Sequence, residues 1–210
     1  MNVRHNLTLI GSDKSFLFLT IGVIRMVHSK KVLREKMLSR LKNLSKSKRE
    51  EINTDLHKQL FIQSDWQQAK TIGITISLNH EWDTWPIIEK AWQEKKKVVV
   101  PKCNPIDRSM TFHQISSKDD LEVQYYHLME PIESKSKKVS ADQIDLLIVP
   151  GVVFDHNHYR IGHGGGYYDR YLSKVDLQTI SLVWHGQLVD KIEINQYDQP
   201  VSKLIVSTVN

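Results

Sequence analysis

Short apolar segments and segments with helical spacing alternate along most of this chain. Apolar, β-branched runs predict strands at residues 71–78, 98–101, 144–149, 179–184 and 204–208. Residues 84–95 and 167–174 carry helical patterns between these runs. Strands that are separated by helices form a mainly parallel sheet with helices on both faces. The pattern therefore predicts a single three-layer α/β/α domain.

The middle of the chain departs from this alternation. Residues 110–115 alternate as an edge strand does, and residues 121–126 are expected to continue that strand. Residues 130–142 are polar and are interpreted as a connection without regular structure.

Two helices are predicted ahead of the first strand. Four apolar side chains share one stripe of residues 29–45: Leu33, Met37, Leu41 and Leu44. Ser29 is suited to cap this helix, and Ser47 is expected to cap the next one, with Glu50 completing a capping box. Together the two helices predict an N-terminal helical hairpin that forms an antiparallel arm.

Residues 1–28 are expected to be a poorly ordered extension or to result from a mis-assigned start, with the working domain at residues 29–210. The apolar run at residues 16–24 is too short to span a bilayer. No small-residue cleavage site follows it, as a signal peptide requires. We therefore expect a protein without membrane attachment.

Composition limits the class of protein further. The chain has 210 residues, of which 25% are charged and 40% hydrophobic, as in an ordinary globular domain. A single cysteine, Cys103, excludes an internal disulfide and fits a reducing cytoplasm. The net charge of +5 favours an anionic ligand, but it does not choose among nucleotide phosphates, a polycarboxylate and nucleic acid.

The strongest chemical signal is a glycine-rich loop at residues 160–170, with the sequence RIGHGGGYYDR. Four glycines in residues 162–166 permit positive φ angles, and a predicted helix follows, so backbone N–H groups can converge on an anion. Phosphate is the expected anion, although a tight turn that only allows close packing fits the same glycines. Asp169 is placed to cap the helix, to pair with Arg160 or Arg170, or to hold a divalent cation.

Several segments together resemble the 5-formyltetrahydrofolate cyclo-ligase family, also called methenyltetrahydrofolate synthetases. The glycine-rich loop and the preceding PGVVFD, residues 150–155, resemble its signature. KKVLR at residues 30–34, EWDT at 81–84 and VPK at 100–102 resemble three further landmarks in the same order. The resemblance runs from about Ser29 to the C-terminus.

This resemblance implies ATP-dependent cyclisation of 5-formyltetrahydrofolate to 5,10-methenyltetrahydrofolate, with ADP and phosphate released and Mg²⁺ required. In the implied mechanism the formyl oxygen is phosphorylated and N10 then attacks the activated carbon. The implied partners are these small molecules, and we expect no nucleic acid, a cytoplasmic location, and a monomer or a weak dimer.

The resemblance also assigns roles to individual residues. It assigns ATP binding to Lys30, Lys31, Val32, Leu33, Arg34, Arg160, Ile161, Gly162, His163, Gly164, Gly165, Gly166, Tyr167 and Tyr168. Catalytic roles fall to Lys30, Arg160 and Tyr168, and Mg²⁺ binding falls to Asp169 and Asp198. Lys30 and Arg34 lie one helical turn apart and are expected to point the same way.

Folate contacts are implied for Ile76, Glu81, His163, Gly164, Gly165, Gly166 and Tyr167. The Glu81 carboxylate is suited to accept hydrogen bonds from the pterin N–H groups. Trp82, Trp85 and Tyr167 are either aromatic faces for the folate or simply core. His163 departs from the cation or methionine expected in relatives, and a neutral imidazole would weaken a charge contact there.

Two other classes of function remain open from the residues alone. The predicted fold is Rossmann-like and similar in topology to sugar-phosphate isomerases and CoA transferases, so another phosphate-handling α/β enzyme is one alternative. Such an enzyme has no need of Lys30, Arg34 and Asp198 together. A basic RNA-binding module is the other, although acidic residues interrupt the lysine-rich helices and no RNA-binding motif is present.

Overall fold

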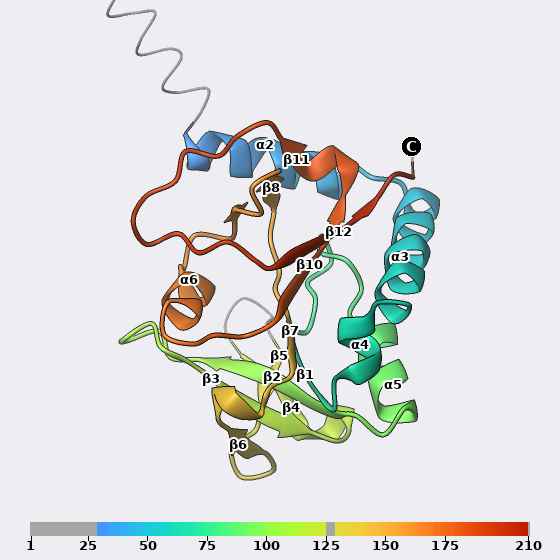
Figure 1. Ribbon diagram of the computed structural model, residues 1–210, viewed down its shortest axis with the longest axis vertical. Helices are drawn as coiled ribbons and strands as arrows, with labels where there is room; N and C mark the ends of the chain where they lie inside the picture. Colours follow the sequence, from blue (N-terminus) through green and yellow to red (C-terminus); the bar gives the residue numbers. More distant parts are fainter. Residues whose placement is uncertain (1–28, 125–128, 210) are drawn as a thin grey trace, which may run out of the picture.

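The computed structural model describes residues 29–124 and 129–209 (Figure 1). Residues 1–28, the expected extension, lie outside the described residues, and so do residues 125–128. No helix in the described ranges combines the length and the apolar character that a bilayer span needs.

Seven strands form the central sheet: β1 (Thr71–Ile74), β2 (Lys97–Cys103), β3 (Met110–Ile115), β6 (Lys137–Val139), β7 (Leu146–Ile148), β10 (Thr179–Trp184) and β12 (Lys203–Ser207). Their order across the sheet is β12-β10-β7-β1-β2-β3-β6. The pairs from β12 to β2 are parallel, whereas β2–β3 and β3–β6 are antiparallel. The predicted mainly parallel sheet is confirmed.

The middle segment differs from the expectation. Residues 110–115 form β3, but β6 lies outside it, so β3 is not the edge. The expected polar connection holds β5 (Met129–Pro131), β6 and a 3-10 turn, η3 (Ala141–Gln143). β4 (Leu121–Val123) leaves the central sheet and pairs with β5 instead of continuing β3. Strands of three residues are too short to show periodicity, which explains the error.

A separate sheet of three short strands leads into the glycine-rich loop. It has the order β11-β8-β9, formed by β11 (Leu188–Val189), β8 (Val153–Asp155) and β9 (Arg160–Ile161). β8 and β9 pair in antiparallel fashion, so the chain turns back before residues 162–166. The loop therefore starts from a paired strand and ends at a helix.

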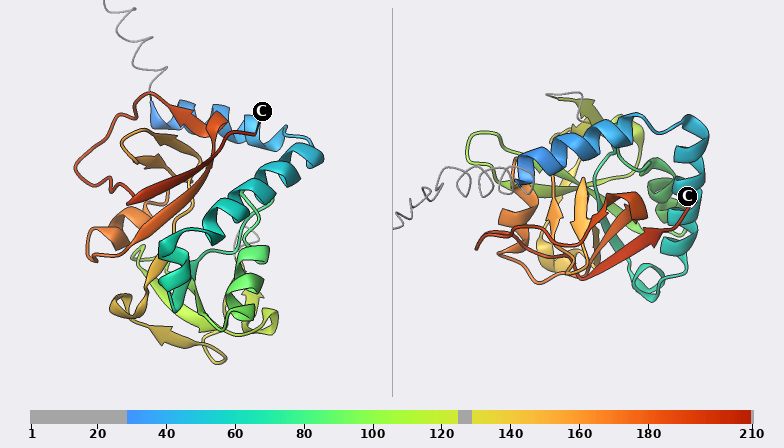
Figure 2. Two further views of the ribbon diagram at one scale, coloured as in Figure 1. Left: turned by 45° about the vertical axis from the view of Figure 1, so that its right-hand side comes forward. Right: turned by 90° about the horizontal axis from the view of Figure 1, so that it is seen from above.

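Helices cover both faces of the central sheet (Figure 2). They are α2 (Lys30–Lys42), α3 (Lys46–Phe61), α4 (Ser64–Gln68), α5 (Trp85–Gln93) and α6 (Tyr167–Leu172), with 3-10 turns η1 (Lys118–Asp120) and η4 (His185–Gln187). Side chains of α3, α4 and α5 belong to one core cluster, and side chains of α6 belong to the other. These are the three layers that the pattern predicts.

Successive side chains of β2 pack alternately into the two core clusters. Val98 and Val100 pack in the cluster of α3 to α5, whereas Val99 packs in the cluster of α6, and all three are fully buried. Successive side chains of a strand point to opposite faces, so a strand buried on both sides must be apolar throughout.

The N-terminal helices differ in detail from the expected arm. The N-cap of α3 is Ser45, whose hydroxyl accepts a hydrogen bond from the Lys48 N–H at 3.2 Å, so the cap lies two residues before Ser47. α2 contacts β8, and α3 contacts β12. Both helices belong to the packed layers rather than to a projecting arm, because their apolar stripes are buried on the sheets.

Candidate functional site

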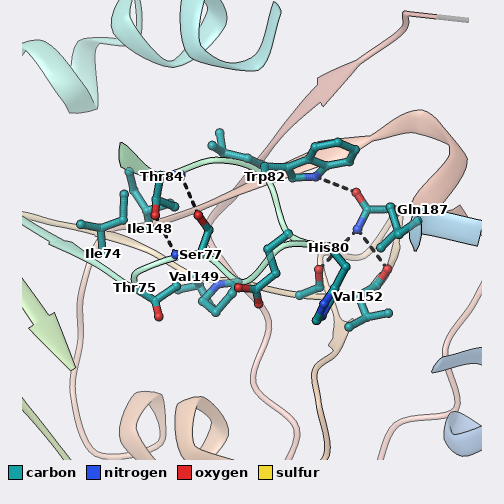
Figure 3. Close-up of a pocket in the computed structure, with 15 residues that line it drawn as sticks. Ile74, Thr75, Ser77, His80, Trp82, Thr84, Ile148, Val149, Val152 and Gln187 are labelled. Carbon is teal, nitrogen blue, oxygen red and sulfur yellow. Dashed lines mark hydrogen bonds between the residues drawn. The ribbon is translucent and has the colours of Figure 1, made fainter. Parts of the chain in front are cut away.

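A cavity lies beyond the carboxyl ends of β1, β7 and β10, where α/β sheets commonly bind ligands (Figure 3). It is lined by Leu41, Ile74, Thr75, Ser77, His80, Glu81, Trp82, Thr84, Ile148, Val149, Pro150, Gly151, Val152, Leu182 and Gln187, and its volume is about 40 Å³. Residues from the loops that follow these three strands all contribute to the lining.

Gln187 lines the cavity beside Trp82 and joins two of these loops (Figure 3). Its side-chain oxygen accepts hydrogen bonds from Trp82 Nε1 at 2.9 Å and from the Trp184 N–H at 3.0 Å. Its amide nitrogen donates to the Val152 carbonyl at 3.1 Å and to the Gly151 carbonyl at 3.3 Å. Because the side chain is buried and fully paired, it fixes the spacing between the loops.

The loop at residues 77–84, called the acidic loop here, is held in shape by its own hydrogen bonds. The Ser77 N–H donates to Thr84 Oγ1 at 2.9 Å, and the Thr84 N–H donates to Ser77 Oγ at 3.1 Å. Glu81 Oε2 accepts from the Leu78 N–H at 2.7 Å. Burial raises the pKa of Glu81 above its usual value, and this hydrogen bond partly opposes the rise.

The glycine-rich loop has the conformation that its sequence predicts. Gly164 has φ +104° and Gly166 has φ +66°, a region in which residues with a side chain are strained. Arg34 reaches the loop from α2, and its Nε donates to the Gly162 carbonyl at 2.6 Å. The guanidinium lies 3.6 Å from the point that a Cβ on Gly164 would occupy. That distance is an ordinary van der Waals contact, so the positive φ rather than a lack of space favours glycine at position 164.

The two loops meet at a pair of histidines. His80 Nε2 lies 2.8 Å from His163 Nε2, and His163 Nδ1 lies 3.8 Å from Glu81 Oε1. Burial lowers the pKa of His80 to about 4, with help from His163 and nearby cations, and burial together with Arg34 lowers the pKa of His163. Both imidazoles are therefore neutral at pH 7.

Arg160 connects the start of the glycine-rich loop to the segment at residues 195–200. Its Nη2 lies 3.2 Å from Asp169 Oδ1, and its Nη1 donates to the Gln199 carbonyl at 2.6 Å. The Gln199 N–H donates to the same Asp169 oxygen at 3.2 Å. Burial lowers the pKa of Arg160, and the neighbouring Asp169, Tyr168 and Asp198 oppose this effect.

Lys30 and Asp198 form an ion pair next to this group, with side chains 26% and 13% exposed. Asp198 also accepts a hydrogen bond from the Asn195 N–H at 2.6 Å. Lys30 and Arg34 thus reach the same side of the site from consecutive turns of α2, as expected. The arrangement brings three cations and two carboxylates together around the glycine-rich loop: Lys30, Arg34, Arg160, Asp169 and Asp198.

The Tyr168 hydroxyl is buried in this region beside the Thr75 side chain, and it makes no hydrogen bond of ordinary geometry within the described part of the chain. Burial raises the pKa of Tyr168, so the phenol is neutral. A buried donor without a partner is costly, and a ligand oxygen would satisfy it.

Comparison with known proteins agrees with this geometry. A family model described as the 5-formyltetrahydrofolate cyclo-ligase family matches residues 26–207. The chain belongs to this family. A 5-formyltetrahydrofolate cyclo-ligase of Escherichia coli (strain K12) is 29% identical over 141 residues, which cover 65% of this chain and 78% of the relative. The Mus musculus protein of the same name is 25% identical over 196 residues, which cover 88% and 97%.

A solved structure supports the same family through its fold. The NMR structure of Aquifex aeolicus 5,10-methenyltetrahydrofolate synthetase superposes with a TM-score of 0.74 at 27% identity. The match covers 84% of this chain and 89% of the Aquifex protein. The cyclo-ligase fold therefore extends over nearly all of the described residues.

Some residues that were predicted to contact ATP or folate have exposed or core positions in the structure. Lys31 is exposed on α2 and pairs with Glu35 at 3.9 Å, and Val32 is 38% exposed. Ile76 is 5% exposed and packs in the core rather than along the cavity. Trp82 is 7% exposed and belongs to the same core cluster. The ligand contacts of Lys31, Val32 and Ile76 stay predictions.

Sequence reasoning missed two residues that shape the cyclo-ligase site. Gln187 carries no sequence signal, because a lone glutamine after a strand has the pattern of an ordinary loop residue. His80 had a weak signal, since it precedes Glu81 in a loop that follows a strand. Its contact with His163 depends on two loops 83 positions apart, which the sequence alone does not place together.

Proposed function

We propose that this protein catalyses the ATP-dependent cyclisation of 5-formyltetrahydrofolate to 5,10-methenyltetrahydrofolate, with release of ADP and phosphate. The family match over residues 26–207 is the observation that carries this proposal. The gathering of cations and carboxylates at the glycine-rich loop supports it independently, since a triphosphate needs both charge neutralisation and a metal site.

On the nucleotide side, Lys30 and Arg34 are proposed to bind phosphate oxygens of ATP. Both side chains are held at the glycine-rich loop by protein acceptors, Asp198 and the Gly162 carbonyl. A phosphate oxygen is a stronger acceptor for Arg34 than the neutral Gly162 carbonyl, because both groups are then charged. The glycine-rich loop, residues 162–166, supplies backbone N–H groups beside them.

Asp169 and Asp198 are the proposed ligands of Mg²⁺, and the residues present fit this ion. Arg160 holds Asp169, whereas Lys30 and the Asn195 N–H hold Asp198, so both carboxylates are fixed at the same site. Mg²⁺ prefers hard carboxylate oxygens and shares its remaining positions with water and phosphate. When bound, it would neutralise charge on the triphosphate.

On the folate side, Glu81 is proposed to accept hydrogen bonds from the pterin, with His163 and Tyr167 close to the reacting formyl group. The cavity volume is about 40 Å³, whereas pockets for ligands of this size hold roughly 300 Å³ or more. The cavity is therefore too small for folate as it stands, and we propose that the acidic loop, which His80 joins to His163 of the glycine-rich loop, moves when folate binds.

The proposed chemistry has two steps. The formyl oxygen attacks the γ-phosphorus of ATP, and ADP leaves. N10 then attacks the activated formyl carbon, phosphate leaves with the former formyl oxygen, and the N10 proton is lost. Lys30 and Arg34 stabilise the transferring charge, Arg160 fixes Asp169, and the buried Tyr168 hydroxyl is positioned to donate to a phosphate or formyl oxygen.

A spectrophotometric assay tests the proposal, because methenyltetrahydrofolate absorbs where 5-formyltetrahydrofolate does not. Absorbance is expected to rise only when the protein, 5-formyltetrahydrofolate, Mg²⁺ and ATP are all present. A protein that shows no turnover, or turnover without ATP, contradicts the proposal. Salt-dependent RNA binding without turnover would favour the RNA-binding alternative. The cytoplasmic location and the monomeric or weakly dimeric state stay predictions.

A further inference from the structure

His80, Glu81 and His163 form a cluster of metal-ligating side chains that the proposed reaction does not require as a unit. Each offers one ligand atom, and these atoms all lie within 4.8 Å of one another. Two of the residues come from the acidic loop and one from the glycine-rich loop. The cluster thus joins the acidic loop to the glycine-rich loop.

We propose that His80, Glu81 and His163 bind Zn²⁺, or a chemically similar divalent transition-metal ion, and that the ion fastens the acidic loop to the glycine-rich loop. Two imidazoles and one glutamate with an open fourth position are a donor set that suits zinc. Asp169 and Asp198, the carboxylates proposed for Mg²⁺, take no part in this site.

The ligand atoms are ready to bind a metal. Glu81 uses Oε2 to accept from the Leu78 N–H at 2.7 Å, which orients the carboxylate and leaves Oε1 facing His163. The His80 and His163 rings share a hydrogen bond between their Nε2 atoms, so one ring carries its proton there. Metal binding moves that proton to Nδ1 of the same ring and frees both Nε2 atoms.

Small movements are enough to form the site. Two nitrogens on a tetrahedral zinc ion lie roughly 3.3 Å apart, whereas the two Nε2 atoms lie 2.8 Å apart. The His163 side chain is 41% exposed, so its ring is free to turn by this amount. Burial and neighbouring cations lower the pKa values of both histidines, which keeps the imidazoles unprotonated and available.

Arg34, Lys42 and Arg49 add positive charge around the histidines, and this charge opposes a second cation. The Glu81 carboxylate, whose side chain is only 16% exposed, supplies the compensating negative charge. The site is therefore expected to favour ions that bond strongly to imidazole over Mg²⁺ or Ca²⁺, which prefer oxygen donors.

A bound ion would have a consequence for turnover, and this part rests on the proposed function. It would occupy Glu81 and hold the cavity in its narrow form, so Zn²⁺ would inhibit competitively against 5-formyltetrahydrofolate and not against ATP. Inhibition of this kind differs from replacement of Mg²⁺ by Zn²⁺ at Asp169 and Asp198, which would depend on the ATP concentration.

The test is a titration of the metal-free full-length chain with Zn²⁺ alone, followed calorimetrically without ATP or folate. Co²⁺ serves as a second probe, because its visible absorption bands become intense in four-coordinate sites. We expect one site whose affinity falls tenfold or more in His80→Ala and in His163→Ala, with loss of the Co²⁺ bands. His156→Ala removes an exposed histidine elsewhere and should bind like the wild type.

Two outcomes would overturn the proposal. One is that the wild type binds no Zn²⁺, and the other is that the affinity for Zn²⁺ is unchanged in both histidine variants. Far-UV circular dichroism and thermal unfolding of each variant check the fold, and His80→Gln and His163→Gln repeat the test with milder changes. Metal binding without turnover would refute the proposed function and leave the metal site standing, whereas turnover without metal binding would do the opposite.

Discussion

Replacing Arg160 by alanine should destabilise the protein strongly, because this guanidinium is buried among fixed partners. The side chain is 3% exposed and contacts Asp169 Oδ1 at 3.2 Å and the Gln199 carbonyl at 2.6 Å. Removing one partner of a buried ion pair costs about 3–5 kcal/mol. Since a domain of this size changes its melting temperature by about 2–4 °C per kcal/mol, the expected loss is roughly 6–20 °C.

Arg160→Lys keeps the positive charge at this position and removes the forked shape of the guanidinium, so it tests the two properties separately. The ammonium keeps the positive charge but cannot reach both Asp169 and Gln199 as the forked guanidinium does. One buried acceptor is then left unpaired, which costs about 1–3 kcal/mol. We therefore expect an intermediate loss of stability and a lower kcat, because Asp169 is held less firmly.

Urea unfolding and thermal unfolding of the three proteins measure these losses. Lys174→Ala is the matched control, since it removes an exposed cation a few residues beyond Asp169 and should change stability by less than about 0.5 kcal/mol. If Arg160→Ala unfolds within about 1 kcal/mol of the wild type, the buried guanidinium does not hold the site together and the reasoning fails.

Three further changes test other parts of the site. Lys30→Met should raise KM for ATP roughly tenfold or more and leave KM for 5-formyltetrahydrofolate nearly unchanged. Equal changes in the two KM values would contradict the assignment of Lys30 to ATP. Gln187→Leu leaves the Gly151 and Val152 carbonyls unpaired and should cost about 1–3 kcal/mol for each in urea unfolding; a loss below that range would refute this role. Because the pKa of His80 falls from 6.5 to about 4 on folding, stability should be full above pH 6.5 and decline toward pH 4. His80→Gln should flatten that decline, and an unchanged slope would exclude His80 as its source.

The parallel part of the fold was predictable because burial on both faces leaves a clear pattern. Residues 146–149 are apolar throughout, and Leu146, Leu147 and Ile148 indeed lie between the two helical layers. The antiparallel additions were not predictable in the same way. β5 and β6 have three residues each and pair with β4 and β3, respectively, and neither strand contains a run of apolar side chains that would reveal it in the sequence.

The part of the candidate site that depends on positive φ angles was predictable, because such angles favour glycine. Gly164 and Gly166 adopt positive φ, and their spacing beside Arg160 and Asp169 was visible in the sequence. The sequence left open whether Asp169 pairs with Arg160 or with Arg170, and the structure pairs it with Arg160. Arg160 is turned toward Asp169 and Gln199, and its guanidinium is enclosed by these protein acceptors.

The N-cap of α3 shows why local signals can mislead by a few residues. Ser45 and Ser47 both precede a charged helical segment, and Ser47 has Glu50 at the capping-box spacing. The structure uses Ser45, which starts α3 two residues earlier and leaves the buried positions Ile52 and Leu56 on the same face of the helix. Both serines satisfy the local rule, and packing decides between them.

The central claim is that the cations and carboxylates around the glycine-rich loop hold Mg-ATP. The most direct measurement is a crystal structure of the protein with Mg²⁺ and a non-hydrolysable ATP analogue. The account predicts that Lys30 leaves its pair with Asp198 and binds phosphate, with Mg²⁺ on Asp169 and Asp198. A nucleotide bound elsewhere, with the Lys30–Asp198 pair intact, would contradict it.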